Sequence, residues 1–274
     1  SSFFNEEKKL GSYLSRLTPI FLGLSILIYG NSKIKIILIL FLVLLIDILV
    51  ILSGERSSIF YVFLSTFLIT ILIKKWKIYR LIAFILSFII SLTIITTNTQ
   101  IKERVILKTA EQLNIFDEKI NVFSIQHQVI YQTAIKIYKD HKLFGIGPKN
   151  FREKCKIEKY KTYTNEDGSV NGCQSHPHNT YIQLLTETGI FGFLFISVIF
   201  ILLNIYIVKH LLLVIFKRKY IFTDSNICFL VAIYVTLWPI VPTGSFFNNW
   251  LSIIYFFPLG LLFPIVKLKD INRL

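Results

Sequence analysis

Charged residues are scarce in this chain. Asp, Glu, Lys and Arg make up only 17% of its 274 residues, whereas 54% are hydrophobic and Phe alone occurs 25 times. An average soluble domain carries about 25% charged residues. The scarcity of charge and the long apolar runs exclude an ordinary soluble domain and indicate an integral membrane protein.

Methionine is absent, so the sequence contains no initiator residue. Residues 1–16 are polar and lack the apolar core of a signal peptide. An odd number of spans with an outer amino terminus is also unusual without something upstream. We therefore expect the chain to be part of a longer multi-pass protein.

Seven apolar runs predict about seven transmembrane helices in an all-α integral membrane protein. Each run has about 14–19 residues, at or below the usual length of a spanning helix, and flanking Ser, Thr and Tyr lengthen most of them. The runs are residues 17–30, 36–53, 59–73, 81–97, 190–208, 225–241 and 251–266. Residues 1–97 are predicted to hold spans one to four, residues 98–189 a large, partly helical loop, and residues 190–274 spans five to seven.

The net charge of +14 would suit a nucleic-acid partner, but its distribution argues against one. Basic residues cluster in alternate short loops, which the positive-inside rule places in the cytoplasm. These residues are Lys33, Lys35, Lys74, Lys75, Lys77, Arg80, Lys209, Lys217, Arg218, Lys219, Lys267, Lys269 and Arg273. The turn "SGERSS", residues 98–189 and the uncharged "PTGSFFNNW" then face the outer side.

Cysteine occurs three times. Cys155 and Cys173 fall in the predicted outer loop, where a disulfide can persist, and the alternative is two free thiols. Cys228 lies in an apolar run and is expected to be a small packing residue.

The outer loop is too long to be structureless. Residues 122–140 repeat apolar side chains at steps of three and four, which predicts an amphipathic helix. Its apolar positions are Val122, Ile125, Val129, Ile130, Ala134 and Ile137. The helix is expected to stop at "HKLFGIGPKNF", where two Gly and one Pro favour a tight turn.

His178 precedes the helix that leads into the fifth apolar run. A histidine there would accept a proton or position a phosphate, and the alternative is a helix cap at the membrane interface. The spacing of His176 and His178 also resembles a two-histidine metal pair, and a metal site needs further ligands. No acidic partner stands at ligand spacing, so we expect no metal.

Arginine suits phosphate recognition because its planar fork forms two parallel hydrogen bonds. Arg16, Arg56 and Arg152 are all predicted on the outer side with His178, which favours an anionic lipid headgroup as ligand. The alternative for Arg16 and Arg56 is anchoring of helix ends. Lys149 would assist or be a solvated loop residue. Asp47, an acid inside a predicted span, would reach the outer side or pair with an arginine.

Three stretches together resemble the O-antigen ligase and polymerase superfamily. "HNTYIQLLTETGIFG" is similar to its signature His-[Asn/Ser/Gln]-x9-Gly-x-x-[Gly/Thr/Tyr], "GIGPKNF" to the turn before it, and "LSGERSSIF" to an arginine element after a span. "FFNEEKKLGSYLSRLTPI" resembles a stretch near the middle of such chains, whose first spans are then missing here.

The resemblance implies a multi-pass enzyme of the bacterial inner membrane with its active site facing the periplasm. Such enzymes transfer a glycan from undecaprenyl pyrophosphate to a lipid A–core acceptor (ligases) or to another lipid-linked glycan (polymerases). No metal, nucleotide or other cofactor is implied, because the pyrophosphate bond carries the driving force. Membrane lipids are the remaining expected partners, and nucleic acid is not one.

By position, His178 matches the family's essential histidine and Arg56 its arginine after the span. A second family arginine has no counterpart here, because His127 stands in its place. Donor contacts are therefore expected from Arg16, His127, Lys149, Arg152, His176 and Asn179.

A transporter of lipid-linked glycans and a structural membrane subunit are the alternatives from other classes. A transporter would place its binding groups near the bilayer midplane on broken helices. A structural subunit would not need Arg and His gathered on one side. Both therefore fit the distribution of charge less well than the enzyme.

Overall fold

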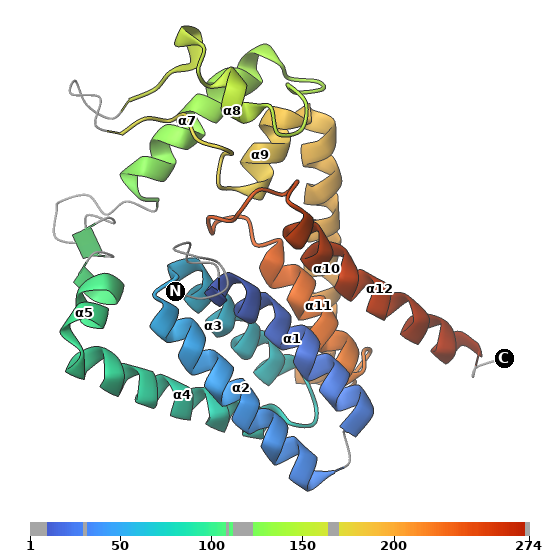
Figure 1. Ribbon diagram of the computed structural model, residues 1–274. Coiled ribbons are helices and arrows are strands. Elements are labelled where there is room, and N and C mark those ends of the chain that lie inside the picture. The colour runs from blue at the N-terminus through green and yellow to red at the C-terminus, as the bar shows by residue number, and fades with distance from the viewer. Residues whose placement is uncertain (1–9, 30–31, 108–109, 112–122, 164–169, 272–274) are drawn as a thin grey trace. The chain divides into compact units, whose positions relative to one another are not determined.

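The computed structural model describes residues 10–29, 32–107, 110–111, 123–163 and 170–271 (Figure 1). Within these residues the regular secondary structure is helical, and the β-type pairing is limited to an isolated bridge between Tyr163 and Asn171. The predicted all-α class is therefore confirmed. The chain divides into two compact units, residues 1–105, 203–237 and 254–274 in the first and residues 106–202 and 238–253 in the second.

The first unit is a helical bundle. It contains α1 (Leu10–Tyr29), α2 (Lys33–Ser53), α3 (Arg56–Leu72), α4 (Lys77–Thr97), α5 (Thr99–Lys102) and α11 (Asp224–Thr236). Three elements belong to both units, namely the π-helical turn Glu103–Leu107, α10 (Gly189–Lys217) and α12 (Asn249–Ile271). α1 packs against α2, α3 and α11, and α2 packs against α4. A Cβ on Gly23 of α1 would lie 2.6 Å from the ring of Phe229 on α11. The small residue therefore permits close approach of these helices.

Among the residues that the structure describes, four helices are long and apolar enough to cross a membrane, namely α1, α2, α4 and α10. They coincide with four of the seven predicted spans. The other three runs fall on the shorter apolar helices Arg56–Leu72, Asp224–Thr236 and Asn249–Leu262. The multi-pass character is supported, and the count of seven stays a prediction.

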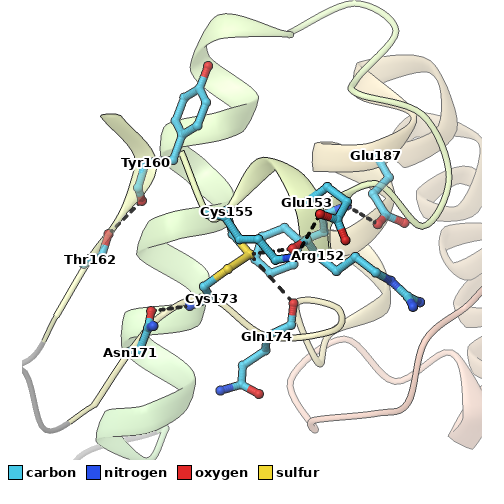
Figure 2. The surroundings of a disulfide bond; sticks show 11 residues. Arg152, Glu153, Cys155, Tyr160, Thr162, Asn171, Cys173, Gln174 and Glu187 are labelled. Atoms are coloured by element: carbon cyan, nitrogen blue, oxygen red, sulfur yellow. Dashed lines mark hydrogen bonds and ion pairs between the residues drawn. A yellow bond between two sulfur atoms is a disulfide. The ribbon is translucent and has the colours of Figure 1, made fainter. Parts of the chain in front are cut away.

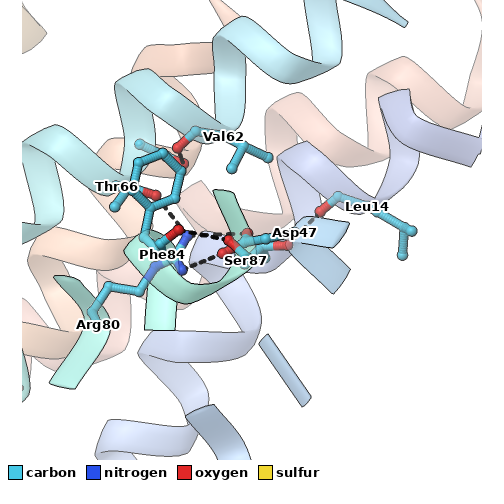
Figure 3. Close-up of polar contacts among 9 residues, drawn as sticks. Leu14, Asp47, Val62, Thr66, Arg80, Phe84 and Ser87 are labelled. Carbon is cyan, nitrogen blue, oxygen red and sulfur yellow. Dashed lines mark hydrogen bonds and ion pairs between the residues drawn. The ribbon is translucent and has the colours of Figure 1, made fainter. Parts of the chain in front are cut away.

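The helix α4 begins earlier than the sequence predicts. Lys77 and Arg80 were expected in a cytoplasmic loop before a span starting at residue 81, yet both lie in the first turn of α4. Arg80 is buried and forms a bidentate ion pair with Asp47 of α2, and it also donates to Thr66 Oγ1 of α3 at 2.6 Å (Figure 3). Of the two roles expected for Asp47, the structure shows pairing with an arginine, although with one assigned to a loop.

The second unit surrounds the amphipathic helix α7 (Ile125–Asp140). Val129, Ile130, Ala134 and Ile137 are buried as predicted, Ile125 is exposed, and Val122 lies outside the described residues. Shorter elements cover this helix, namely α8 (Phe151–Lys154), a 3-10 turn (Glu158–Tyr160) and α9 (Thr180–Glu187). The core they share is formed by Ile130, Tyr131, Ala134, Ile137, Phe151, Cys155 and Tyr160.

Removing one partner of the Asp47–Arg80 pair should destabilise the first unit. Asp47→Ala leaves a guanidinium buried without its carboxylate, which typically costs about 3–5 kcal/mol. We expect a large fall in the melting temperature of the purified protein in detergent. The double variant Asp47→Leu/Arg80→Met removes both charges and should melt close to the wild type. Equal losses in the single and double variants would contradict this account.

Candidate active site

The turn "SGERSS" in the first unit caps two helices. Gly54 ends α2 with a left-handed backbone, φ 68°, and its N–H donates to Ile51. The Glu55 carboxylate then accepts the N–H groups of Gly11 and Ser12, at 2.8 and 2.9 Å, in the first turn of α1. A carboxylate is favourable there because helix N-termini carry unpaired N–H groups and partial positive charge.

This turn presents Arg56 as the first residue of α3, with an exposed side chain. Arg16, the other predicted phosphate ligand in this unit, is only 1% exposed. Its guanidinium lies 4.3 Å from the ring centre of Tyr61 and donates to the Ser12 carbonyl at 3.1 Å. Of these two arginines, Arg56 is the one exposed at the surface of its unit, and substrate contact by Arg16 stays a prediction.

Three histidines cluster in the second unit. The ring centre of His178 lies 4.0 Å from that of His176 and 5.8 Å from that of His127, which meets it edge-on. His127 Nδ1 pairs with Ser124 Oγ at 2.6 Å, and His176 Nδ1 with Ser175 Oγ at 2.9 Å. The structure thus brings together three side chains that are separated by up to 51 positions along the chain (178 − 127).

Burial favours the neutral form of two of these rings. Desolvation, the neighbouring His178 and the positive charge of Arg152 lower the pKa of His176 from 6.5 to about 3, against a backbone contact with Thr243 that raises it. Desolvation also lowers the pKa of His178 below its ordinary value of 6.5. A neutral imidazole is the form that accepts a proton, so the site favours His178 as a base near neutral pH.

The backbone of His178 is itself unusual. Its φ of 55° lies in the left-handed region, which is uncommon for residues other than Gly, although Asn, Asp and His adopt it more often than most. The His178 carbonyl accepts the N–H of Thr243 at 2.9 Å. Strained conformations of this kind persist where surrounding contacts fix them, and they concentrate at functional sites.

Asn179 uses its side-chain amide inside the protein. Its Oδ1 accepts the N–H groups of Tyr181 and Ile182 at 3.0 and 3.1 Å, which caps α9, and its Nδ2 donates to the Pro239 carbonyl at 2.7 Å. Asn179 is 4% exposed. The sequence predicted a substrate contact for this residue, and that contact stays a prediction beside the observed capping role.

A buried polar chain supports the other end of α9. Glu187 (Figure 2) accepts the N–H of Phe151 at its Oε1, at 3.1 Å. Its Oε2 accepts from Gln183 Nε2 at 2.9 Å. Gln183 also donates to Ser245 Oγ and accepts the N–H of Phe246. Sequence reasoning missed this set and the Thr243 contact. "PTGSFFNNW" was recognised only as an uncharged outer segment, and its Gly and Pro were the available signal of a specific turn.

Gly145 and Gly189 let two backbones touch. Ile146 and Gly147 donate to the carbonyls of Thr186 and Glu187 at 3.1 and 2.8 Å. A Cβ on Gly145 would overlap the Glu187 backbone, and a Cβ on Gly189 would overlap the Leu143 backbone. Both glycines also have positive φ, 67° and 69°. Larger residues are therefore disfavoured both by the overlap and by the backbone conformation.

Two further residues predicted to bind the donor, Lys149 and Arg152, come shortly after Gly145–Gly147 in the sequence. Lys149 and Arg152 are exposed in and after the "GIGP" turn, and Lys149 has a left-handed backbone, φ 63°. A disulfide joins Cys155, directly after α8, to Cys173, three residues before His176, with 5.1 Å between their Cα atoms (Figure 2). The bridge therefore ties the basic α8 to the segment that carries the histidines.

The described part of the chain shows no cluster of side chains suited to bind a metal ion. No group of three or more His, Cys, Asp or Glu side chains there is placed to hold an ion.

The signature histidine, its cap and its glycines all lie within one stretch that a family model recognises. The model described as O-antigen ligase matches residues 39–197, more than half of the chain. The chain belongs to the O-antigen ligase family. No curated protein and no solved structure matches it.

Membership in the O-antigen ligase family makes this chain a membrane enzyme of the ligase and polymerase type. Substrates of that type are in general a lipid-linked glycan and a glycan acceptor. The resemblance predicted from the sequence motifs is thereby confirmed.

Substituting two glycines separates the effect of the close backbone contact from the effect of alanine on helix stability. Gly189→Ala should place a methyl group against the Leu143 carbonyl at positive φ, and we expect a loss of glycan transfer and a lower melting temperature. Gly260→Ala is the matched control, because a Cβ on Gly260 of α12 meets nothing within 4 Å and Ala favours helix by about 1 kcal/mol. Wild-type behaviour of Gly189→Ala in the same assays would contradict the close-contact explanation.

Proposed function

We propose that the protein transfers a glycan from undecaprenyl pyrophosphate to a lipid A–core sugar at the periplasmic face of the bacterial inner membrane. The observation that carries the proposal is His178, a desolvated histidine in a strained backbone position, packed between two other imidazoles at the start of α9. Such an arrangement suits a general base for a sugar hydroxyl.

The reaction is an inverting displacement. The acceptor hydroxyl oxygen attacks the anomeric carbon of the donor, and its proton passes to a ring nitrogen of His178. The bond between that carbon and the pyrophosphate oxygen breaks, and the electron pair leaves with undecaprenyl pyrophosphate. Attack from the face opposite the leaving group inverts the anomeric configuration.

Negative charge develops on the pyrophosphate as this bond breaks. Fixed cations stabilise such charge most where water is sparse. Arg56 supplies a planar fork on the first unit, and Lys149 and Arg152 supply exposed positive charges on the second. We propose that these groups bind the diphosphate, with His127 in the position where the family has an arginine.

The other candidate contacts are given distinct roles. His176 is held neutral beside His178, which suits a hydrogen bond to a donor sugar or phosphate oxygen. Asn179 caps the helix behind the base, so we propose that it acts by positioning His178. The lipid tail of the donor would lie among the apolar helices.

Complementation of a deletion strain tests this function. Loss of the gene should remove long glycan from lipid A while lipid-linked polymer accumulates, and the wild-type gene should restore the pattern. His178→Ala should fail to restore it at equal membrane levels, since general-base catalysis is typically worth 10²–10⁴-fold. His141→Ala, a variant of another loop histidine at the end of α7, is the control and should restore it.

The glycolipid pattern separates the alternatives. A single glycan repeat that remains on lipid A in the deletion strain would assign the chain to a polymerase, whose acceptor is a second lipid-linked glycan. Full activity of His178→Ala would remove this residue from the mechanism.

The pH dependence follows from the desolvation of His178. Its pKa is lowered from 6.5, so the neutral base persists as pH falls below 6.5 and is lost only when pH passes through the lowered pKa. We expect the acid limb of kcat/KM, which reports the free enzyme, to have its midpoint below pH 6.5. Transfer to a defined acceptor by the purified enzyme measures it. A midpoint above 6.5 would exclude a desolvated His178 as the base.

A further inference from the structure

Two large apolar side chains stand exposed at the tip of the turn after α7. Leu143 is 58% exposed and Phe144 is 75% exposed, although neighbouring Ile146 and Phe151 are partly or fully covered. Adjacent exposed apolar residues of this size indicate a contact surface. The tip lies within a loop otherwise rich in charge.

The tip is fixed to the beginning of the apolar helix α10. Ile190 donates its N–H to the Lys142 carbonyl at 2.9 Å, and Gly189 leaves room for the Leu143 backbone. The ring of Phe144 lies 5.6 Å from that of Phe191, with 30° between the planes. Leu143 and Phe144 therefore sit at the level of the first turn of α10.

The charge pattern of α10 sets the depth of that turn. Residues 190–208 contain no charged side chain, and Lys209 follows. At 1.5 Å per residue this stretch is about 28 Å long, close to the roughly 30 Å of a bilayer core. Its first turns carry outward apolar side chains, with Phe191 58%, Leu194 48% and Phe195 66% exposed. Gly189 then marks the edge of the hydrocarbon region.

We propose that the tip Leu143–Phe144 inserts into the lipid leaflet in which α10 begins, as an interfacial anchor of the histidine-bearing loop. The partner is the bilayer itself, since the tip continues the apolar surface of a candidate membrane span. Exposed Lys142 beside it suits the headgroup layer, where long basic side chains reach water from an apolar stem. The anchor would hold the turn after α7 at a constant depth in the membrane interface.

Spin-label accessibility in vesicles tests the insertion directly. The full chain with Phe144→Cys, labelled with a nitroxide and reconstituted in phosphatidylcholine with phosphatidylglycerol, should collide with dissolved oxygen more than with a polar nickel chelate. The native cysteines do not compete, because Cys155 and Cys173 are bridged and Cys228 is buried. Leu143→Cys gives a second reporter should the first variant fail to fold.

Two labelled controls define the scale. Phe191→Cys marks the start of α10, and Glu158→Cys marks an exposed polar position of the same loop, 84% exposed. Labels at 143 and 144 that behave like the one at 191, which itself favours oxygen, support the anchor. Chelate access equal to that at 158 overturns it, and so does shielding from both reagents, which would mean a protein partner. The readout needs no transfer activity, so it stands apart from a failure of the proposed reaction.

Discussion

The second unit depends on one contact between two stretches of main chain. The turn before α8 and the junction of α9 with α10 approach so closely that neither glycine there tolerates a Cβ. Four hydrogen bonds cross this seam, three between backbones and one from Phe151 to Glu187. Because α9 is only eight residues long, fixing its end also fixes its beginning. The position of His178 therefore follows from glycines up to 33 residues away (178 − 145).

Carboxylates serve the two units in the same way, as acceptors for main-chain N–H groups. Glu55 accepts N–H groups from the first turn of α1, and Glu187 accepts the first N–H of α8. Glu55 precedes Arg56 in the sequence, and Glu187 binds the start of α8, which carries Arg152. Both arginines are proposed to bind the donor. Bonds from backbone N–H groups to a carboxylate are charge-assisted and stronger than neutral ones. Glu187 holds the basic α8 by its first N–H group, whereas Glu55 joins the turn that carries Arg56 to the start of α1.

Local patterns in the sequence predicted the elements that surround the histidine cluster. The period of α7, the "GIGP" turn and the His-Asn…Gly-x-x-Gly spacing each depend on neighbouring residues, and the structure contains all three. The supports of the site are non-local. Nothing near Glu187 indicates that it would accept the N–H of Phe151, 36 positions away, and Thr243 reaches His178 from beyond α10 and α11. Arg80 was assigned to a loop because charge near a span end normally is exposed, whereas Asp47 and Thr66 satisfy it inside the bundle.

The same desolvation that keeps His178 neutral weakens it as a base, since a lower pKa means a smaller driving force for taking a proton. A pyrophosphate donor would offset this. Its negative charge beside the ring favours the imidazolium form and raises the pKa, so the base would gain strength when the donor is bound. Burial lowers the pKa of His176 to about 3, so this ring competes less for the proton. In the proposed reaction, proton acceptance would thereby be coupled to donor binding, and activation of an acceptor hydroxyl would be restricted to the complex that can use it.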